Sequence, residues 1–402
     1  MEGFLLNCNK EFMDKYILAI DAGTTSSRSI LFDKNANPIE IAQYEFNQFF
    51  PKEGWVEHDP LEIWNIQLKA IRDVIKKSKI DPKNIDSIGI TNQRETTVIW
   101  NKDTGQPVYN AIVWQDRRTA SFCDKLKEEN KSELIQNKTG LVIDAYFSGT
   151  KIKWILDSNS EIREQADKGQ LIFGTIDTWL IWNLSKGKYH LTDPSNASRT
   201  LLYNIKDDMW DDELLEIFDV PRNILPKVVD SSAISANIDE EILGSKIPIA
   251  GIAGDQQAAL FGQLCINPGD IKNTYGTGCF CMMNTGKSAV KSKNKMLSTI
   301  AWRINGEVTY ALEGSVFVAG ALIQWLRDKL AIIKDAPEVE NLANTVKDNG
   351  GVTFIPALSG LAAPYWDPYA QGTIFGITRG TENGHIARAA LESIALRTRD
   401  II

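Results

Sequence analysis

Short apolar runs recur along the chain, each bounded by glycine, proline or polar residues. Runs of this kind that are rich in β-branched and aromatic residues predict β-strands. The predicted strands cover residues 16–20, 87–91, 96–100, 171–175, 247–253, 271–277 and 308–312. Between several of these runs the apolar residues change to a helical spacing. Strands alternating with helices indicate an α/β architecture of mixed sheets flanked by helices.

Residues 60–78 carry the clearest helical pattern, with apolar residues at three- and four-residue intervals. This spacing predicts an amphipathic helix. The side chains expected on its buried face are Leu61, Trp64, Leu68, Ile71 and Ile75. At 402 residues the chain exceeds the length at which one core stops growing, so we expect two domains.

Residues 16–33 combine two strand-like runs with a turn that suits an anion. No lysine ends the turn and the chain continues as a strand, so a β-hairpin is expected rather than a P-loop. Gly23 would let the backbone approach a ligand closely. The hydroxyl and amide groups of Thr24, Thr25 and Ser26 suit phosphate oxygens.

Asp21 stands beside this expected anion site. A carboxylate cannot touch a phosphate directly, because two negative charges ~4 Å apart repel by several kcal/mol at intermediate dielectric. A Mg²⁺ ion that keeps several water ligands resolves the conflict, since Asp21 could hold it while it bridges phosphate oxygens. Arg28 adds a cation nearby. The alternative is a hairpin whose side chains cap their own turn. Residues 270–286 repeat the strand, turn and strand pattern, which indicates two halves that share a cleft.

Asp255 follows the predicted strand 247–253 at the start of a helical pattern. It is either a helix N-cap, with its pKa lowered by the helix dipole, or a general base. In phosphoryl transfer the acceptor proton leaves late, so a weak base suffices and both roles are compatible.

Arg94 and Glu95 lie between two predicted strands. They are either a solvated surface pair or, in a cleft, partners for the hydroxyls of a polyol such as glycerol.

Trp114, Tyr146 and Phe280 are either core residues or apolar walls against the C–H faces of such a ligand.

The composition of the chain excludes several classes of protein. A net charge of −8 disfavours nucleic acid, and no run approaches the roughly 18 apolar residues of a membrane span. The N-terminus lacks a basic leading segment, so we expect a cytoplasmic location and no membrane insertion. Five unpaired cysteines read as buried apolar residues.

Several segments together resemble the FGGY carbohydrate kinases of the actin-like ATPase superfamily. These segments are DAGTTSSR, GITNQRET, GWVEHDP, AIVWQDRRT, YFSGTKIKW, GIAGDQQAALFGQ, NTYGTGCF, EGSVFVAGALIQWLRD and FIPALSGLAAPYWDP. The resemblance implies a two-domain, ribonuclease H-like fold with its active site in the interdomain cleft. It divides the chain into an N-terminal extension (1–15), an N-terminal domain (16–260) and a C-terminal domain (261–402).

The resemblance also implies ATP-dependent phosphorylation of glycerol to sn-glycerol 3-phosphate, with Mg²⁺ as cofactor. It assigns Asp255 as general base, with Asp21 and Asp255 near the metal. The nucleotide contacts that it implies are Thr24, Thr25, Ser26, Arg28, Thr277, Gly320 and Gln324. The glycerol contacts that it implies are Arg94, Glu95, Trp114, Tyr146, Asp255, Gln256 and Phe280.

Three alternatives stay open. The first is another FGGY kinase that acts on a pentulose or gluconate. The second is an actin-like or chaperone-like ATPase without an acceptor. The third is an inactive shortened kinase. The family continues beyond the position of Ile402 into a glycine-rich loop that contacts adenine, so we expect the C-terminal domain here to be incomplete. A homodimer or homotetramer is expected for the longer form.

Overall fold

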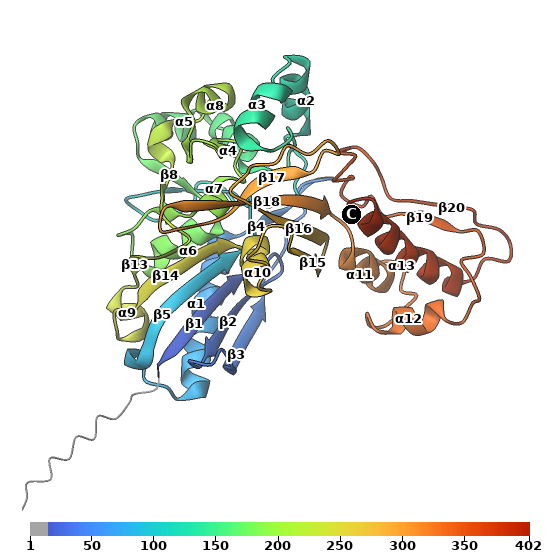
Figure 1. The fold of residues 1–402 in the computed structure, drawn as a ribbon, viewed down its shortest axis with the longest axis horizontal. Coiled ribbons are helices and arrows are strands. Elements are labelled where there is room, and N and C mark those ends of the chain that lie inside the picture. The colour runs from blue at the N-terminus through green and yellow to red at the C-terminus, as the bar shows by residue number, and fades with distance from the viewer. Residues whose placement is uncertain (1–14) are drawn as a thin grey trace, which may run out of the picture.

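In the computed structural model, which describes residues 15–402, a six-stranded mixed sheet organises the first part of the chain (Figure 1). Its strands, in spatial order, are β13 (Ser232–Asn237), β14 (Pro248–Gly254), β5 (Ile85–Asn92), β1 (Tyr16–Ala22), β2 (Ser26–Phe32) and β3 (Pro38–Glu45). Strands β14, β5 and β1 run parallel, whereas β2 returns antiparallel to β1 as the predicted hairpin. Apart from Lys15, the predicted N-terminal extension lies outside the described residues, as does Cys8.

Helices α1 (Pro60–Ser78) and α6 (Ile176–Leu184) share one apolar core with this sheet. The predicted bounds of α1 are confirmed, but its buried face is only partly as predicted. Four of the predicted residues are only half-buried: Leu61, Trp64, Leu68 and Ile75. The fully buried face of the helix includes Gln67 instead.

Gln67 is buried because it has hydrogen-bond partners beneath the first hairpin. Its Nε2 donates to the carbonyl oxygen of Arg28 (3.2 Å) and to Ser29 Oγ (3.0 Å). A polar residue can occupy the centre of a buried face when its donors are satisfied in this way. The helix is therefore rotated towards Gln67 relative to the face that the apolar pattern alone predicts.

A second, antiparallel sheet follows in the C-terminal part. Its strands, in spatial order, are β15 (Ile271–Tyr275), β16 (Cys279–Gly286), β18 (Glu307–Val316) and β17 (Leu297–Ile304). Helix α10 (Asp255–Gly262) contacts strands of both sheets. The elements at the right of Figure 1 are α11 (Gly320–Asp328), α12 (Glu338–Ala343), β19 (Thr353–Ile355), β20 (Thr373–Phe375) and α13 (Asn383–Arg399).

Five helices gather at the top of Figure 1, beyond the strand layers. They are α2 (Ala120–Glu128), α3 (Ser132–Thr139), α4 (Ser148–Asp157), α5 (Ser160–Asp167) and α8 (Asp212–Phe218). Short elements connect the rest: β4 (Glu57–His58), β6 (Val98–Asn101), β7 (Ala111–Ile112), β8 (Leu171–Gly174), β9 (Leu191–Thr192), α7 (Pro194–Ala197), β10 (Tyr203–Asn204), β11 (Met209–Trp210), β12 (Lys227–Val228) and α9 (Glu240–Leu243). The five helices share one apolar core with the second sheet. The described cysteines, Cys123, Cys265, Cys279 and Cys281, are buried and free, as predicted.

The register of the parallel strands determines where the turns meet. Ala22 at the end of β1 pairs with Asn92 at the end of β5, and Asn92 pairs with Gly254 at the end of β14. Because parallel strands end at the same sheet edge, the turns that follow lie side by side. No helix of residues 15–402 is both long and apolar enough to cross a bilayer.

Asp177, in the first turn of α6, makes folding stability depend on pH. Its buried carboxylate accepts hydrogen bonds from Thr175 and Thr192, yet burial raises its pKa to about 7. The folded state therefore keeps a proton that the unfolded chain loses near pH ~3.9. Stability from this group is complete below that pH and is lost as the pH rises towards 7.

We predict that Asp177→Asn stabilises the protein above pH 7, by about 1 kcal/mol or more, because the variant cannot acquire the buried charge. Urea unfolding at pH 5 and pH 8 measures the effect, and the gain over wild type should be larger at pH 8. Asp103→Asn, at an exposed position, is the control and should follow wild type at both values. An equal difference from wild type at both pH values for Asp177→Asn contradicts the prediction.

Candidate active site

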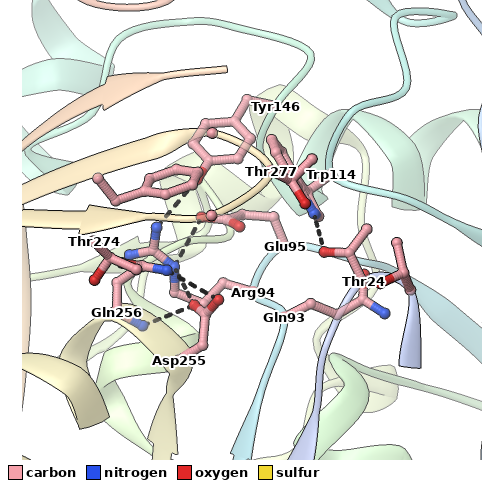
Figure 2. A pocket seen from close by; sticks show the side chains of 14 residues that line it. Thr24, Gln93, Arg94, Glu95, Trp114, Tyr146, Asp255, Gln256, Thr274 and Thr277 are labelled. Carbon is pink, nitrogen blue, oxygen red and sulfur yellow. Dashed lines mark hydrogen bonds and ion pairs between the residues drawn. The ribbon is translucent and has the colours of Figure 1, made fainter. Parts of the chain in front are cut away.

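A cavity of about 200 Å³ opens where these turns meet (Figure 2). Its lining residues are Thr24, Thr25, Gln93, Arg94, Glu95, Trp114, Tyr146, Asp255, Gln256, Thr274, Gly276, Thr277, Gly278 and Phe280. All but Gln93, Thr274, Gly276 and Gly278 are predicted site residues. The cavity is therefore bounded by both hairpin tips, the β5–β6 turn, the start of α10 and three aromatic rings.

Asp255 is the first residue of α10 and follows β14 directly, as predicted. Its Oδ1 accepts the backbone N–H of Gln256 (2.8 Å) and its Oδ2 accepts Gln256 Nε2 (3.1 Å). The N-cap position belongs to Gly254 rather than to Asp255. Burial raises the pKa of Asp255 although Arg94 opposes it, so the predicted lowering by the helix dipole is wrong. A raised pKa is better suited to a general base.

Arg94, in the turn between β5 and β6, is 3% exposed. Its Nη1 donates to Gln257 Oε1 (3.1 Å) and Glu313 Oε2 (2.5 Å), and its Nη2 donates to Tyr146 Oη (3.1 Å) and Glu313 Oε1 (3.1 Å). The neighbouring Glu95 is 1% exposed. The alternative of a solvated surface pair is therefore wrong for Arg94 and Glu95.

A second arginine completes a group that we call the buried charge ring: Arg94, Glu313, Arg199 and Glu95. Arg199 Nε donates to Glu95 Oε1 (2.6 Å) and Arg199 Nη2 donates to Glu313 Oε1 (2.9 Å). Arg94 Nε lies 3.8 Å from Glu95 Oε1, which closes the ring. Burial raises the pKa of Glu95, whereas at Glu313 the two guanidinium groups outweigh burial and lower the pKa to about 2.

Arg199 and Glu313 were not predicted from the sequence. Arg199 follows the short helix α7, and Glu313 lies inside β18, directly after the predicted strand 308–312. A charged residue among the buried residues of a strand was the available signal at Glu313. Nothing nearby in the sequence identifies its partner, because 219 positions separate it from Arg94.

Lys272, in β15, is a further site residue that was not predicted from the sequence. Its Nζ donates to Gln256 Oε1 (2.5 Å), Thr274 Oγ1 (2.9 Å) and the carbonyl oxygen of Phe280 (3.3 Å). Burial lowers its pKa to about 8. Because a lysine only donates, Gln256 must present its carbonyl oxygen to Lys272 and its amide N–H to Asp255.

The three predicted aromatic residues lie together at the cavity. The ring of Trp114 meets Tyr146 and Phe280 edge to face, with centroids 5.7 and 5.9 Å apart. Phe317, behind them, lies 5.3 Å from Tyr146. Trp114 Nε1 also donates to Thr24 Oγ1 (2.9 Å), which ties this aromatic wall to the first hairpin.

The first hairpin brings Thr24 and Thr25, but not Ser26, into the cavity wall. Asp21 and Arg28 face each other across β1 and β2 and form an ion pair outside that wall. Besides burial, the charge of Asp21 raises the pKa of Asp255, so these two carboxylates act on each other.

The second hairpin brings Thr277 into the wall, whereas Gly320 and Gln324 lie outside it. The N–H of Gly320 donates to the carbonyl oxygen of Gly276 (2.9 Å), and a Cβ at Gly320 would lie 2.5 Å from that oxygen. Gly320 therefore lets α11 begin against the hairpin turn. Gln324 is exposed on α11.

The donor set suits Mg²⁺ better than a metal held by protein alone. Within residues 15–402 no group of three or more histidine, cysteine, aspartate or glutamate residues could hold an ion. Mg²⁺ commonly takes one or two carboxylates, keeps waters and completes its shell with substrate phosphates. The carboxylates of Asp21 and Asp255 fit this pattern.

Comparisons with known proteins find related sequences and structures that cover nearly all of this chain. Two curated relatives are glycerol kinase 2 of Thermotoga maritima, 60% identical over 96% of this chain and 78% of the relative, and glycerol kinase 1 of Clostridium tetani, 60% identical over 97% and 78%. Among solved structures, Plasmodium falciparum glycerol kinase with ADP has a TM-score of 0.83 at 38% identity, covering 96% of this chain and 78% of that one. A gluconate kinase from Lactobacillus acidophilus has a TM-score of 0.81 at 26% identity, covering 96% and 77%.

The structural neighbours confirm the predicted actin-like α/β fold. The predicted domain limits, 16–260 and 261–402, remain predictions. Residues 16–262 match the N-terminal domain of the FGGY family of carbohydrate kinases, and residues 271–402 match its C-terminal domain. The chain therefore belongs to the FGGY family of carbohydrate kinases.

Proposed function

We propose that the chain transfers the terminal phosphoryl group of ATP to a terminal hydroxyl of glycerol, giving sn-glycerol 3-phosphate and ADP. One observation carries the proposal: the carboxylate of Asp255 shares a small cavity with the Arg94 and Glu95 pair and with an aromatic wall. The 60% identity to proteins named glycerol kinases supports the same acceptor.

The acceptor end of the cavity suits a short polyol. Arg94 supplies a donor and Glu95 an acceptor for neighbouring hydroxyls. Trp114, Tyr146 and Phe280 cover the C–H faces and limit the length of carbon chain that fits. Gln256, held by its bond to Lys272, keeps an N–H directed at Asp255 and so orients the carboxylate.

At the phosphate end, Thr24, Thr25 and Thr277 offer hydroxyl and backbone donors from the two hairpins. The acceptor oxygen forms its bond to the γ-phosphorus as the bond to the β,γ-bridging oxygen breaks and ADP leaves. Asp255 receives the hydroxyl proton late in this step. Mg²⁺, held by Asp21 and Asp255, would neutralise charge on the phosphate oxygens. The other nucleotide contacts that we propose are Ser26, Arg28, Gly320 and Gln324.

The homodimeric or homotetrameric state and the cytoplasmic location stay predictions of the sequence. Solution measurements on the purified chain address the first, and cell fractionation addresses the second.

We predict ADP release that depends on glycerol and exceeds release with xylulose or gluconate at the same concentration. The aromatic wall is the physical reason, because it leaves little room for a longer carbon chain. A coupled ADP assay with the three acceptors, and a control without any acceptor, measures this. A preference for the ketose or the sugar acid contradicts glycerol as substrate, and ADP release that needs no acceptor favours a simple ATPase.

Asp255→Asn should lower kcat by roughly 10²- to 10⁴-fold, because the variant cannot accept the hydroxyl proton. The same ADP assay at saturating glycerol measures the loss. Asp239→Asn is a matched control, since Asp239 also stands at the start of a helix and caps Glu241 but lies outside the cavity. Wild-type kcat in both variants would show that Asp255 only supports the helix.

Gly254→Ala should raise the KM for glycerol by roughly 10- to 100-fold, because displacing a binding group by an ångström has effects of this size. A Cβ at Gly254 would lie 2.7 Å from both Cγ and Cδ of Arg94, so the guanidinium group must shift. Steady-state kinetics with varied glycerol test this. Gly262→Ala, where a Cβ meets no atom within 4 Å, is the control and should keep the wild-type KM. An unchanged KM in Gly254→Ala contradicts the role of Arg94 in acceptor binding.

A further inference from the structure

Two polar atoms of the buried charge ring make no hydrogen bond with residues 15–402, although one of them lies 3.4 Å from Asp255. Four bonds occupy both Nη atoms of Arg94, whereas its Nε donates no hydrogen bond to any residue of 15–402. Arg199 bonds Oε1 of Glu95, whereas Oε2 accepts no hydrogen bond from this part of the chain. Both Arg94 and Glu95 line the cavity. One donor and one acceptor thus remain available to two hydroxyls.

We propose that Glu313 and Arg199 are positioning residues for the acceptor, which hold Arg94 Nε and Glu95 Oε2 in the orientation that binds two neighbouring hydroxyls. This proposal rests on the proposed function in taking a polyol as the acceptor. Neither Glu313 nor Arg199 lines the cavity, so both act through the residues that do.

Glu313 has a specific effect on Arg94. It binds both Nη atoms in a two-point, charge-assisted pair, the strongest kind of hydrogen bond available to a guanidinium group. Without that pair, the nearest carboxylates to Arg94 are Asp255, 3.4 Å from Nε, and Glu95, 3.8 Å from Nε. Arg94 would then turn towards them and occupy the groups that the acceptor and its proton need.

Arg199 has the corresponding effect on Glu95. Its Nε holds Oε1 at 2.6 Å while its Nη2 reaches Glu313 at 2.9 Å, so one planar group fixes two carboxylates at once. A lysine could supply the charge but not this geometry. The side chains of both Arg199 and Glu313 are fully buried, so water cannot replace a lost partner.

The ring also joins the two halves of the chain at the acceptor site. Arg94, Glu95 and Arg199 belong to the part that matches the N-terminal family domain, whereas Glu313 belongs to the part that matches the C-terminal one. The orientation of Arg94 therefore depends on where β18 lies. Acceptor binding consequently requires the second sheet, even though most acceptor contacts come from the first part of the chain.

The test is Glu313→Gln, which keeps the shape of the side chain and removes its charge. We expect the KM for glycerol, and its Kd measured by calorimetry, to rise roughly 10- to 100-fold, with the KM for ATP within about twofold of wild type. A residue that serves only folding would lower the melting temperature without separating the two KM values. A wild-type KM for glycerol in Glu313→Gln overturns the proposal.

Glu57→Gln is the matched control. Glu57 is also a buried carboxylate paired with an arginine, Arg118, at 2.7 Å, but it does not line the cavity or belong to the ring. We expect it to keep the wild-type KM for glycerol. An equal rise in both variants would show a general effect of losing a buried ion pair and would overturn the proposal.

If Glu313→Gln does not fold, Arg199→Lys tests the proposal in its place. This variant preserves the charge of the ring but cannot bond both carboxylates in the same geometry. We expect a rise of roughly tenfold in the KM for glycerol, and a wild-type value overturns the proposal. Calorimetry separates the two proposals. Wild-type protein that binds glycerol but transfers no phosphate contradicts only the proposed function, whereas wild-type protein that binds no glycerol contradicts both.

Discussion

The structure of the acceptor site depends on the pairing of four buried charges. Removing an ionised side chain from water costs several kcal/mol even after the protein relaxes, and only well-placed partners offset that penalty. In the ring of Arg94, Glu313, Arg199 and Glu95 each charge has opposite charges on both sides. Displacing any member leaves each of its two neighbours buried with one partner fewer. The backbone segments that carry these residues are therefore held in place by electrostatics as well as by apolar packing.

The sequence was informative where function lies at the ends of regular elements. Thr24, Arg94 and Asp255 each follow a recognisable strand, and the aligned ends of β1, β5 and β14 bring their turns together. Glu313 and Lys272 lie within strands instead, where the residue type gives no sign of a distant partner. Gln67 escaped prediction for a similar reason, since its burial depends on acceptors in β2.

The backbone conformation of Glu95 is a second feature that could not be predicted from the residue type. Glu95 has a φ of 60°, in the left-handed region that few residues other than glycine adopt. The surrounding structure holds it there: Ser148 Oγ and Thr97 Oγ1 both donate to its carbonyl oxygen, and Arg199 fixes its carboxylate. Strain of this kind persists only when several contacts oppose its release, and it is concentrated at functional sites. A glutamate in a predicted turn carries no sequence signal for it.

The same contacts reconcile a strong cation with a working base in one small cavity. Asp255 forms a long ion pair with Arg94, 3.4 Å from its Nε, which would tighten if the guanidinium group were free to turn. The ring keeps this contact at 3.4 Å, because Glu313, Gln257 and Tyr146 already occupy both Nη atoms. Lys272, the other nearby cation, is likewise turned away and bonds Gln256 rather than Asp255. The two cations therefore shape the acceptor site through intermediaries, and the carboxylate that must take a proton is left facing the cavity.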